Sequence, residues 1–407
     1  MLPSGEAGER PVNGEQDQKR ANGAVPDEAP GPLTGVRVIE LGGIGPGPFC
    51  AMLLADAGAD VIRVERPSDV AGRPDPVLHR GRRSAAIDLK HPEGVGAVLD
   101  LVADADVLLE GFRPGVAERL GVGPGPCLDR NPRLVYGRMT GFGQDGPLAP
   151  RAGHDINYIA LSGALGAIGE ADGPPVLPLN LLGDFGGGGA LLAFGVLCAV
   201  VQARATGKGQ VVDAAMVDGS AQLLAMIYGR LHQGRWTDGR GVNYLDGTAP
   251  FYGVYRCRDD EYVAVGAIEA PFFATLLERL ELVADADFAQ QWDRSRWPVM
   301  RRRLAEVFAA RTRDDWAAVF ADADACVTPV LSLAEAPRHP HNAARGTFLT
   351  DGTGVLQPAP APRFGSSTPR RHTRPAPLPG EHTAQVLAET GRSPEQIKKL
   401  FDAEVVR

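Results

Sequence analysis

The stretch VRVIELGGIGPGPFCAMLLADAGADVIRVE, residues 36–65, decides the fold class. It begins with a β-branched run at 36–41 and a glycine-rich turn at 42–48. An apolar-periodic segment at 49–55 follows, and a second β-branched run occupies 59–65. A strand, a turn, a helix and a strand in this order predict a βαβ unit with parallel strands.

The same alternation continues along the chain and predicts a doubly wound α/β domain, whose ligands bind outside the carboxyl ends of the strands. The expected elements are strands at 85–89, 106–110, 133–139 and 210–213, and helices at 91–103, 190–204 and 214–232. The pattern then changes. A hairpin at 250–268, turning at Asp259 and Asp260, and helices up to about residue 322 predict a smaller α+β domain.

Composition suggests how the rest of the chain is divided. Residues 1–31 contain no aromatic and almost no aliphatic side chains, so we expect a disordered tail. A proline-rich stretch at 357–380 predicts a stiff connection, and the last helix is expected at 382–402. The expected parts are a tail at 1–31, a large domain at 32–213, a linker at 214–248, a small domain at 249–340, a linker at 341–360 and a C-terminal return to the large domain at 361–407.

The overall charge argues against nucleic-acid binding. The 407 residues include 42 Lys and Arg against 50 Asp and Glu, a formal net charge of −8, whereas non-specific nucleic-acid binding needs a positive field. No apolar run approaches the roughly 20 residues that span a bilayer, and no secretory signal is visible, so we expect a cytoplasmic protein. The cysteines are scattered without a CxxC pair, which predicts neither a disulfide framework nor a metal site: Cys50, Cys127, Cys198, Cys257 and Cys326.

Basic residues gather at the ends of the expected strands. Such a patch on an acidic protein suits a phosphorylated cofactor or carrier, because guanidinium groups match phosphate oxygens. The alternative for each residue is a solvated surface charge. The residues are Arg66, Arg73, Arg80, Arg82, Arg83, Lys90, Arg113 and Arg119.

The turn at 42–48 has part of the glycine spacing of a dinucleotide site. Gly43 and Gly45 fit that spacing, but Pro48 stands where a third glycine belongs. Glu65 lies about 20 residues further on, as a ribose-binding acid would, yet a basic residue follows it at once. We therefore favour a simple tight turn between strand and helix over nicotinamide binding.

Two further segments carry groups suited to proton transfer. His154 and Asp155 stand in a polar turn ahead of a helix, where the alternative roles are a turn residue and a helix cap. Asp184 lies just before a run of glycines that leads into an apolar helix. A carboxylate beside free helix N–H groups can act as a base while those groups hold an oxyanion. The alternative is a helix cap with a glycine packing face.

Eight ordered segments resemble the class III CoA-transferase superfamily, of the CaiB/BaiF type, and within it the α-methylacyl-CoA racemase branch. The segments are GPLTGVRVIELGGIGPGPFCAMLLADAGADVIRVERP, IDLKHPEG, LLEGFRPGVAERLG, RMTGFGQDGP, AGHDINYIALSGALGAIG, LNLLGDFGGGG, GKGQVVDAAMVDGS and YVAVGAIE, and they cover roughly residues 32–365. The resemblance implies a Rossmann-like large domain with a smaller α+β domain, in an interlocked homodimer.

The resemblance also implies site residues. His154 and Asp184 match the two acid/base residues, and Glu269 matches a carboxylate that the partner subunit places near the histidine. The CoA-binding residues implied in the same way are Arg66, Ala86, Ile87, Leu89, Lys90, Gly111, Phe112, Arg113, Arg119, Gly153, Asp155, Ile156, Asn157 and Tyr158. No metal and no separate cofactor are expected, because CoA is part of the substrate.

The implied reaction inverts the α-carbon of 2-methylacyl-CoA thioesters by 1,1-proton transfer through an enolate. Backbone N–H groups of the Gly153 loop and of Gly186–Gly189 would hold the enolate oxygen. The alternative is a class III CoA-transferase, in which Asp155 forms an acyl anhydride. A CoA-binding protein without catalysis is disfavoured, because all three reacting residues are present. The expected partners are an acyl-CoA substrate and a second copy of the chain, with no nucleic acid and no membrane span.

Overall fold

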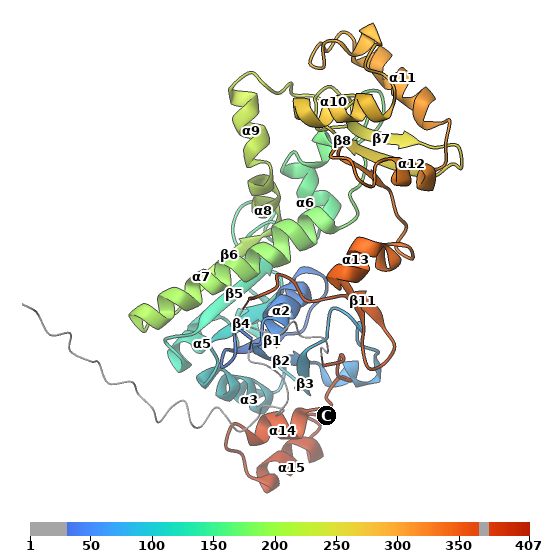
Figure 1. The fold of residues 1–407 in the computed structure, drawn as a ribbon. Coiled ribbons are helices and arrows are strands. Elements are labelled where there is room, and N and C mark those ends of the chain that lie inside the picture. Colours follow the sequence, from blue (N-terminus) through green and yellow to red (C-terminus); the bar gives the residue numbers. More distant parts are fainter. Residues whose placement is uncertain (1–30, 366–373) are drawn as a thin grey trace, which may run out of the picture.

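The computed structural model describes residues 31–365 and 374–407. Figure 1 shows two parts: a larger one built around a parallel sheet, and a smaller one at the top of the view, coloured yellow to orange. On the return path from the smaller part, α13 (Pro340–Arg345) lies between the two. The expected tail at 1–31 lies almost entirely outside the described residues.

Six parallel strands organise the larger part, in the order β3-β2-β1-β4-β5-β6. Their bounds are β1 Arg37–Leu41, β2 Asp60–Glu65, β3 Arg82–Ala86, β4 Val107–Glu110, β5 Val135–Thr140 and β6 Gln210–Ala215. The order reverses at β1, which is the pattern of a doubly wound fold with its ligand crevice at the carboxyl ends of the strands. The predicted α/β architecture with a parallel sheet is confirmed.

Helices cover both faces of the sheet, because side chains alternate between the faces along each strand. Val38, Val61 and Val107 point to the face covered by α2 (Pro46–Asp56) and α7 (Leu191–Thr206). The opposite face is covered by α3 Pro92–Ala103, α5 Pro124–Arg130, α14 Thr383–Ala388 and α15 Pro394–Asp402. The C-terminal helices therefore pack into the core of the larger part.

The third strand of the sheet begins earlier than its sequence suggests. We expected a strand at 85–89, but β3 pairs with β2 from Arg82 onward, with Arg82 opposite Val61. All five residues of β3 are buried, including its two arginines. The local sequence pattern predicts a solvated loop at two adjacent arginines. The strand was missed because the acidic residues that neutralise these arginines lie in distant parts of the chain.

Two expected helices are each divided. The segment 214–232 forms α8 (Met216–Leu223) and α9 (Ala225–His232), which meet at a non-helical residue. The segment 382–402 is divided into α14 and α15, with Gly391 at φ 84° between them. Glycine favours this left-handed conformation, so the chain can turn sharply there.

The smaller part has a core of its own. Its sheet is antiparallel and confirms the predicted hairpin, with Asp260 at φ 65° in the turn. The elements are β7 Tyr252–Arg256, β8 Tyr262–Gly266, β9 Val327–Pro329, α10 Ala270–Arg279, α11 Trp297–Phe308 and α12 Arg313–Val319. Its buried apolar side chains all come from residues 249–325.

Shorter elements complete the described residues. They are η2 Pro67–Ala71, α4 Val116–Arg119, α6 Asp155–Leu161, η3 Leu165–Ala167, η4 Leu181–Ala190, η5 Ala286–Phe288, η6 Ala336–Arg338, β10 Phe348–Thr350 and β11 Leu356–Pro358. β10 and β11 form an antiparallel pair, so the start of the stretch expected as a stiff proline-rich connection is a strand. Residues 366–373 of that stretch lie outside the described residues.

The π-helix η4 runs directly into α7. Together they form one helix of 26 residues, Leu181–Thr206, which by length and composition alone could cross a membrane. The expectation that no apolar stretch approaches that length was wrong here. Leu192 and Val196 of α7 are fully buried against the sheet, so the apolar character of the helix has an explanation in the core.

Glycines allow η4 to lie directly against its neighbours. A Cβ at Gly187 would lie 2.6 Å from the backbone nitrogen of Ser220 in α8, and one at Gly189 would lie 2.5 Å from the carbonyl oxygen of Pro46 in α2. From the side of α8, a Cβ on Gly219 would lie 1.8 Å from the carbonyl oxygen of Gly187. A side chain at these positions would force the helices apart. These glycines therefore form a packing face.

We predict that Gly219→Ala lowers the free energy of unfolding by about 2–3 kcal/mol, because the added methyl group overlaps the Gly187 carbonyl. Gly96→Ala in α3 is the matched control: a Cβ there has no neighbour within 4 Å, and alanine favours a helix by up to about 1 kcal/mol. Urea-induced unfolding measures both changes. Equal stability of Gly219→Ala and the unmodified chain would show that the close approach is not a constraint.

Candidate active site

The carboxyl ends of the six parallel strands form one edge of the sheet, and the loops that leave it carry most of the predicted site residues. After β1 the chain turns into α2 through Gly45, whose φ of 67° is a left-handed conformation that favours glycine. A Cβ on Gly45 would lie 3.5 Å from Asp184 Oδ2. The backbone of the glycine-rich turn therefore lies directly beside the Asp184 carboxylate.

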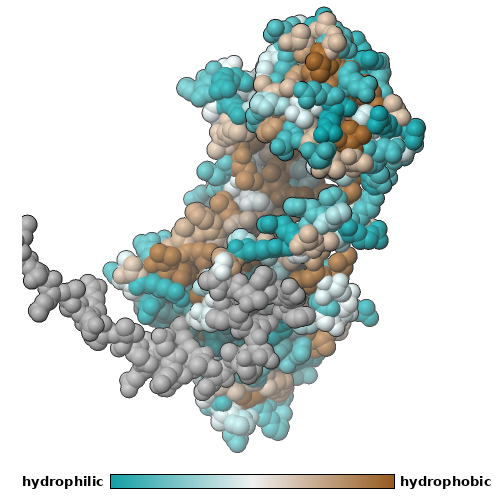
Figure 2. Space-filling view, viewed as in Figure 1, coloured by the Kyte–Doolittle hydropathy of each residue, from teal (hydrophilic) through white to brown (hydrophobic). Residues whose placement is uncertain are grey.

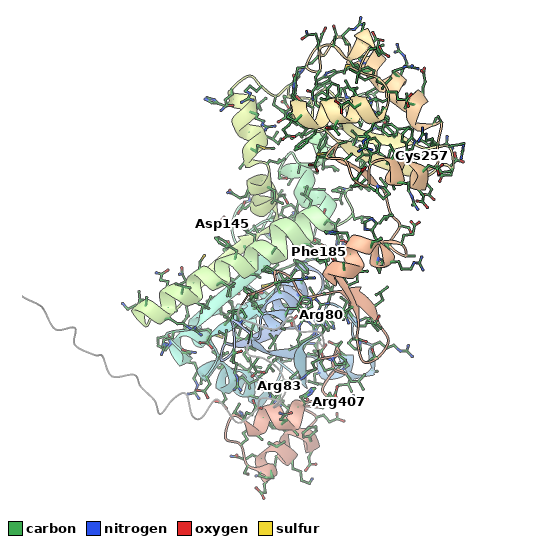
Figure 3. The ribbon with its side chains drawn as sticks, viewed as in Figure 1. Arg80, Arg83, Asp145, Phe185, Cys257 and Arg407 are labelled. Carbon is green, nitrogen blue, oxygen red and sulfur yellow. The ribbon has the colours of Figure 1, made fainter. Side chains whose placement is uncertain are left out.

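Asp184 is a half-buried residue of η4. A π-helix is rare and is often found at functional sites. The next residue, Phe185, which Figure 3 labels, packs against Phe49 of α2, with 4.8 Å between the ring centroids. The Asn180 side-chain amide donates a hydrogen bond to Asp184 Oδ2 at 3.0 Å. Backbone packing and this bond together fix the carboxylate.

The surroundings raise the pKa of Asp184 above its ordinary value. Burial is the largest cause, and the hydrogen bond from Asn180 opposes it by favouring the ionised form. The charge of Asp155 raises the pKa further, and that of His154 lowers it. A carboxyl group with a raised pKa holds a proton closer to neutral pH and can return it, as acid–base catalysis requires.

His154 lies at the start of α6, at the end of the loop that leaves β5. Its side chain is exposed, and its backbone N–H donates to Asn157 Oδ1 at 3.0 Å. The Tyr158 hydroxyl donates to the Gly153 carbonyl, and the Tyr158 ring packs edge-on against Phe142. The main chain around His154 is therefore fixed while its imidazole stays open to a ligand.

The structure places His154 and Asp184 close together, because a hydrogen bond joins the side chain of the residue after His154 to the main chain of Asp184. Asp155, between them, is turned toward η4. Its Oδ2 accepts the backbone N–H of Gly183 at 2.6 Å and that of Asp184 at 2.7 Å. Sequence reasoning gave Asp155 the role of a CoA contact, a cap of its own helix or, in the alternative transferase, the nucleophile, and missed this bond to another helix.

The predicted oxyanion donors of the glycine run are wrong for this structure. Gly186–Gly189 lie inside η4, where the i→i+5 bonds of a π-helix use their N–H groups. At the start of η4, Asp155 takes the N–H groups of Gly183 and Asp184. The donor role of the loop at Gly153 stays a prediction.

Glu269 belongs to the smaller part, immediately before α10, and its side chain is exposed. Burial and then the charge of Glu269 raise the pKa of the Cys326 thiol. Within the part of the chain that the structure describes, no hydrogen bond or ion pair joins Glu269 to His154 or Asp184. The approach of Glu269 to the other two reacting residues therefore stays a prediction.

The predicted CoA-binding residues fall into exposed and buried groups. The exposed group follows the carboxyl ends of β2, β3 and β4 and consists of Arg66, Lys90, Gly111, Arg113 and Arg119. Leu89 and Phe112 are half-buried, whereas Ala86 and Ile87 are buried. The Ala86 N–H donates to Thr383 Oγ1 at 2.9 Å, and its carbonyl accepts from the Arg407 N–H at 3.1 Å. Contact of these two buried residues with CoA stays a prediction.

Three arginines of the expected positive patch instead neutralise acids inside the larger part. The side chains of Arg80, Arg82 and Arg83 are at most 8% exposed; Figure 3 labels the first and the last of them. The ion pairs are Arg80–Asp56 at 2.6 Å, Arg82–Glu40 at 3.0 Å and Arg83–Asp60 at 2.7 Å. Their expected role in holding a phosphorylated ligand is wrong, because their charges are buried and paired.

The fold and the pair of acid–base groups define an α/β enzyme with its site at the carboxyl edge of the sheet. Residues 33–383 match the model of CoA-transferase family III. The chain is 46% identical to α-methylacyl-CoA racemase of Mus musculus over 374 residues, and 45% identical to that of Homo sapiens over 377 residues; each match covers 92% of this chain and 97% of the relative. A crystal structure of a CAIB/BAIF family protein from Brucella suis matches with a TM-score of 0.77 at 29% identity, over 89% of this chain and 100% of that chain. The chain therefore belongs to CoA-transferase family III.

We predict that Asn180→Ala raises the pKa of Asp184 further, because the ionised carboxylate loses a hydrogen bond that favours it. For the epimer from which Asp184 removes the proton, kcat rises with pH as Asp184 ionises. A higher pKa of Asp184 therefore moves this rising limb of kcat to higher pH. Gln210→Ala is the control: it removes an exposed amide hydrogen bond at the opposite edge of the sheet, to Gln202 Oε1. An unshifted limb in Asn180→Ala would contradict the assignment of that limb to Asp184.

Proposed function

We propose that this chain is a racemase that inverts the α-carbon of 2-methylacyl-CoA thioesters. The observation that carries the proposal is that the start of α6, which carries His154, is hydrogen-bonded to the residues of η4 that carry Asp184, so an imidazole and a carboxylate lie close together at the edge where ligands bind in this fold. The identity to the racemases of mouse and human supports the same activity here.

The chemistry explains why two acid–base groups are needed. A proton α to a thioester carbonyl has a pKa on the order of ten units above that of a neutral base, so unaided removal costs at least about 14 kcal/mol. Hydrogen-bond donors at the enolate oxygen and the exclusion of water lower that barrier. Inversion adds a second requirement, because the proton leaves one face of the planar intermediate and returns to the other.

In the proposed mechanism, His154 takes the α-proton on one face, and the C–H electron pair becomes part of the enolate. Asp184 then donates a proton to the other face, and the same electron pair forms the new C–H bond. The roles exchange for the opposite epimer. The raised pKa of Asp184 supports its acid role. The exposed Arg66, Lys90 and Arg113 would hold the phosphates of CoA, which is part of the substrate.

The alternative activity, CoA transfer, needs Asp155 as a nucleophile toward the thioester carbonyl. That residue is 6% exposed, and one of its oxygens already accepts two backbone hydrogen bonds. Hydrogen bonds to a carboxylate stabilise its charge and so reduce its reactivity as a nucleophile. The environment of Asp155 therefore favours proton transfer over group transfer.

In D2O, we expect the enzyme to exchange the α-proton of a 2-methylacyl-CoA for deuterium and to interconvert the two epimers without an added acid. His154→Ala and Asp184→Ala each remove the group that serves one face, so each lowers the rate of interconversion by ~10²–10⁴-fold. NMR follows the deuterium, and chiral chromatography of the hydrolysed acid follows the epimers. Transfer of CoA to an added carboxylic acid, with no exchange in its absence, would establish the transferase instead.

We further propose that two copies of the chain form an interlocked homodimer, each with a large domain at 32–213 and a small domain at 249–340. Exposed apolar side chains on α7 and α9 support a partner: Phe194, Val201 and Tyr228 are 66%, 69% and 54% exposed. Figure 2 shows apolar surface over α7. Contiguous apolar surface of this kind is typical of an interface. In such a dimer, Glu269 of the partner subunit would orient the imidazole of His154.

Mixed dimers test the origin of this carboxylate. We expect Asp184→Ala and Glu269→Ala to be severely impaired when each is expressed alone. Co-expressed with two different affinity tags and purified as the mixed dimer, they should regain activity, because one of its two sites then has all three reacting residues intact. An inactive mixed dimer would show that Glu269 serves the site of its own chain.

A further inference from the structure

Asp155 joins the two elements that carry the proposed acid–base groups. It is the first residue of α6, directly after His154, and its side chain reaches the start of η4. Its Oδ2 accepts the N–H groups of Gly183 and Asp184 at 2.6 and 2.7 Å. The residue is 6% exposed, and its Oδ1 has no hydrogen-bond partner among the described residues. The carboxylate is thus committed to η4 and held away from solvent.

The two hydrogen bonds to Asp155 give backbone N–H groups at the start of η4 an acceptor that the helix itself does not provide. The first N–H groups of a helix have no partner inside it, and their positive end attracts a carboxylate. A residue at the cap position usually provides the acceptor. Asn180 holds that position in η4 but makes no cap bond, and its amide nitrogen donates to the Asp184 side chain instead. The cap therefore comes from α6, a separate element.

We propose that Asp155 is a positioning residue, which ties the main chain of Asp184 to the residue next to His154 and so sets the separation of the two acid–base groups. The inference rests on the proposed racemase function, and it gives Asp155 neither a nucleophilic nor a CoA-binding role. The two groups must meet opposite faces of one carbon. A displacement of about 1 Å in such an arrangement costs on the order of 100-fold in rate.

The charge of Asp155 has a second consequence. After burial and the opposing Asn180 bond, it is the next cause that acts on the pKa of Asp184, and it raises that pKa. The groups that face Asp184 or pack against its helix are His154 ahead of α6, Asp155 and Tyr158 from α6, Asn180 ahead of η4, Gly45 ahead of α2, Phe49 from α2, and Met216 and Ser220 from α8. Loss of the Asp155 charge removes the negative member of this set, so the pKa of Asp184 falls.

Two substitutions separate the hydrogen bonds from the charge. Asp155→Asn keeps an oxygen that can accept the two N–H groups but carries no charge, whereas Asp155→Ala removes both. Asp75→Asn is the matched control, since Asp75 Oδ1 also accepts two backbone N–H groups, of Val77 and Leu78 at 2.9 and 2.8 Å, in an exposed loop. The measurements are kcat, KM and the pH dependence of epimer interconversion with a 2-methylacyl-CoA, together with thermal unfolding.

We expect Asp155→Ala to lose kcat on the order of 100-fold with little change in KM, because the acid–base groups move while the CoA contacts stay. Asp155→Asn keeps most of its rate, and the limb of the pH profile that belongs to Asp184 moves to lower pH. Asp75→Asn matches the unmodified enzyme in rate and profile. If Asp155→Ala does not fold, Asp155→Glu tests the position instead: it keeps the charge but moves the acceptor oxygen by one methylene group, so we expect it to lose kcat with little change in KM.

Other outcomes overturn the inference. An unchanged kcat in Asp155→Ala would rule out a positioning role, and an unshifted profile in Asp155→Asn would rule out the effect of charge. A raised KM with normal kcat would make Asp155 a binding residue. A failure of the proposed function is seen separately, since the unmodified enzyme would then interconvert no epimers.

Discussion

The direct contact of η4 with α2 and α8 is the constraint on which the site depends. Main-chain atoms of Gly187 meet those of Gly219, and Gly189 lies against the Pro46 carbonyl, with no side chain between the helices. A π-helical segment holds more residues per turn than an α-helix, so it changes the direction in which its side chains project. The glycine run is therefore a rigid packing surface, and its rigidity holds the carboxylate of Asp184 at the carboxyl edge of the sheet.

Buried ion pairs fix the turn that leads into α2, the helix against which η4 packs. Arg63 donates to the Gly43 carbonyl at 3.1 Å and Arg82 donates to the Pro48 carbonyl, so two guanidinium groups bracket the turn that leads into α2. Both arginines pair with Glu40, which is 1% exposed. Removing one partner of a buried pair costs about 3–5 kcal/mol, because an uncompensated charge remains. The turn beside Asp184 is thus fixed by electrostatics within the sheet.

The sequence predicts the parts of this structure that depend on short segments. Uninterrupted β-branched runs beside glycine turns gave β1 and β2 to within one residue. β3 was misplaced because its arginines are neutralised by Glu40, Asp60 and Glu389, which no local window contains. The resemblance to the family pointed to His154 and Asp184 as the acid–base pair, a role that stays a prediction. The bond from α6 to η4 and the use of the glycine N–H groups depend on the packing of distant elements, and so they required the structure.

The same packing bears on which chemistry the fold supports. The family takes its description from CoA transfer, whereas the relatives at 45–46% identity are racemases, so one fold serves two activities. The presence of Asp155 beside His154 does not distinguish racemase from transferase activity, because an aspartate at this position is compatible with both. The surroundings of Asp155 distinguish the two activities. Its oxygen accepts hydrogen bonds from N–H groups at the start of a helix, and these bonds withdraw electron density that a nucleophile needs to attack a carbonyl carbon. With Asp155 committed to η4, our proposal leaves Asp184, half-exposed and close to the imidazole of His154, as the carboxylate that reacts, and its chemistry there is proton transfer.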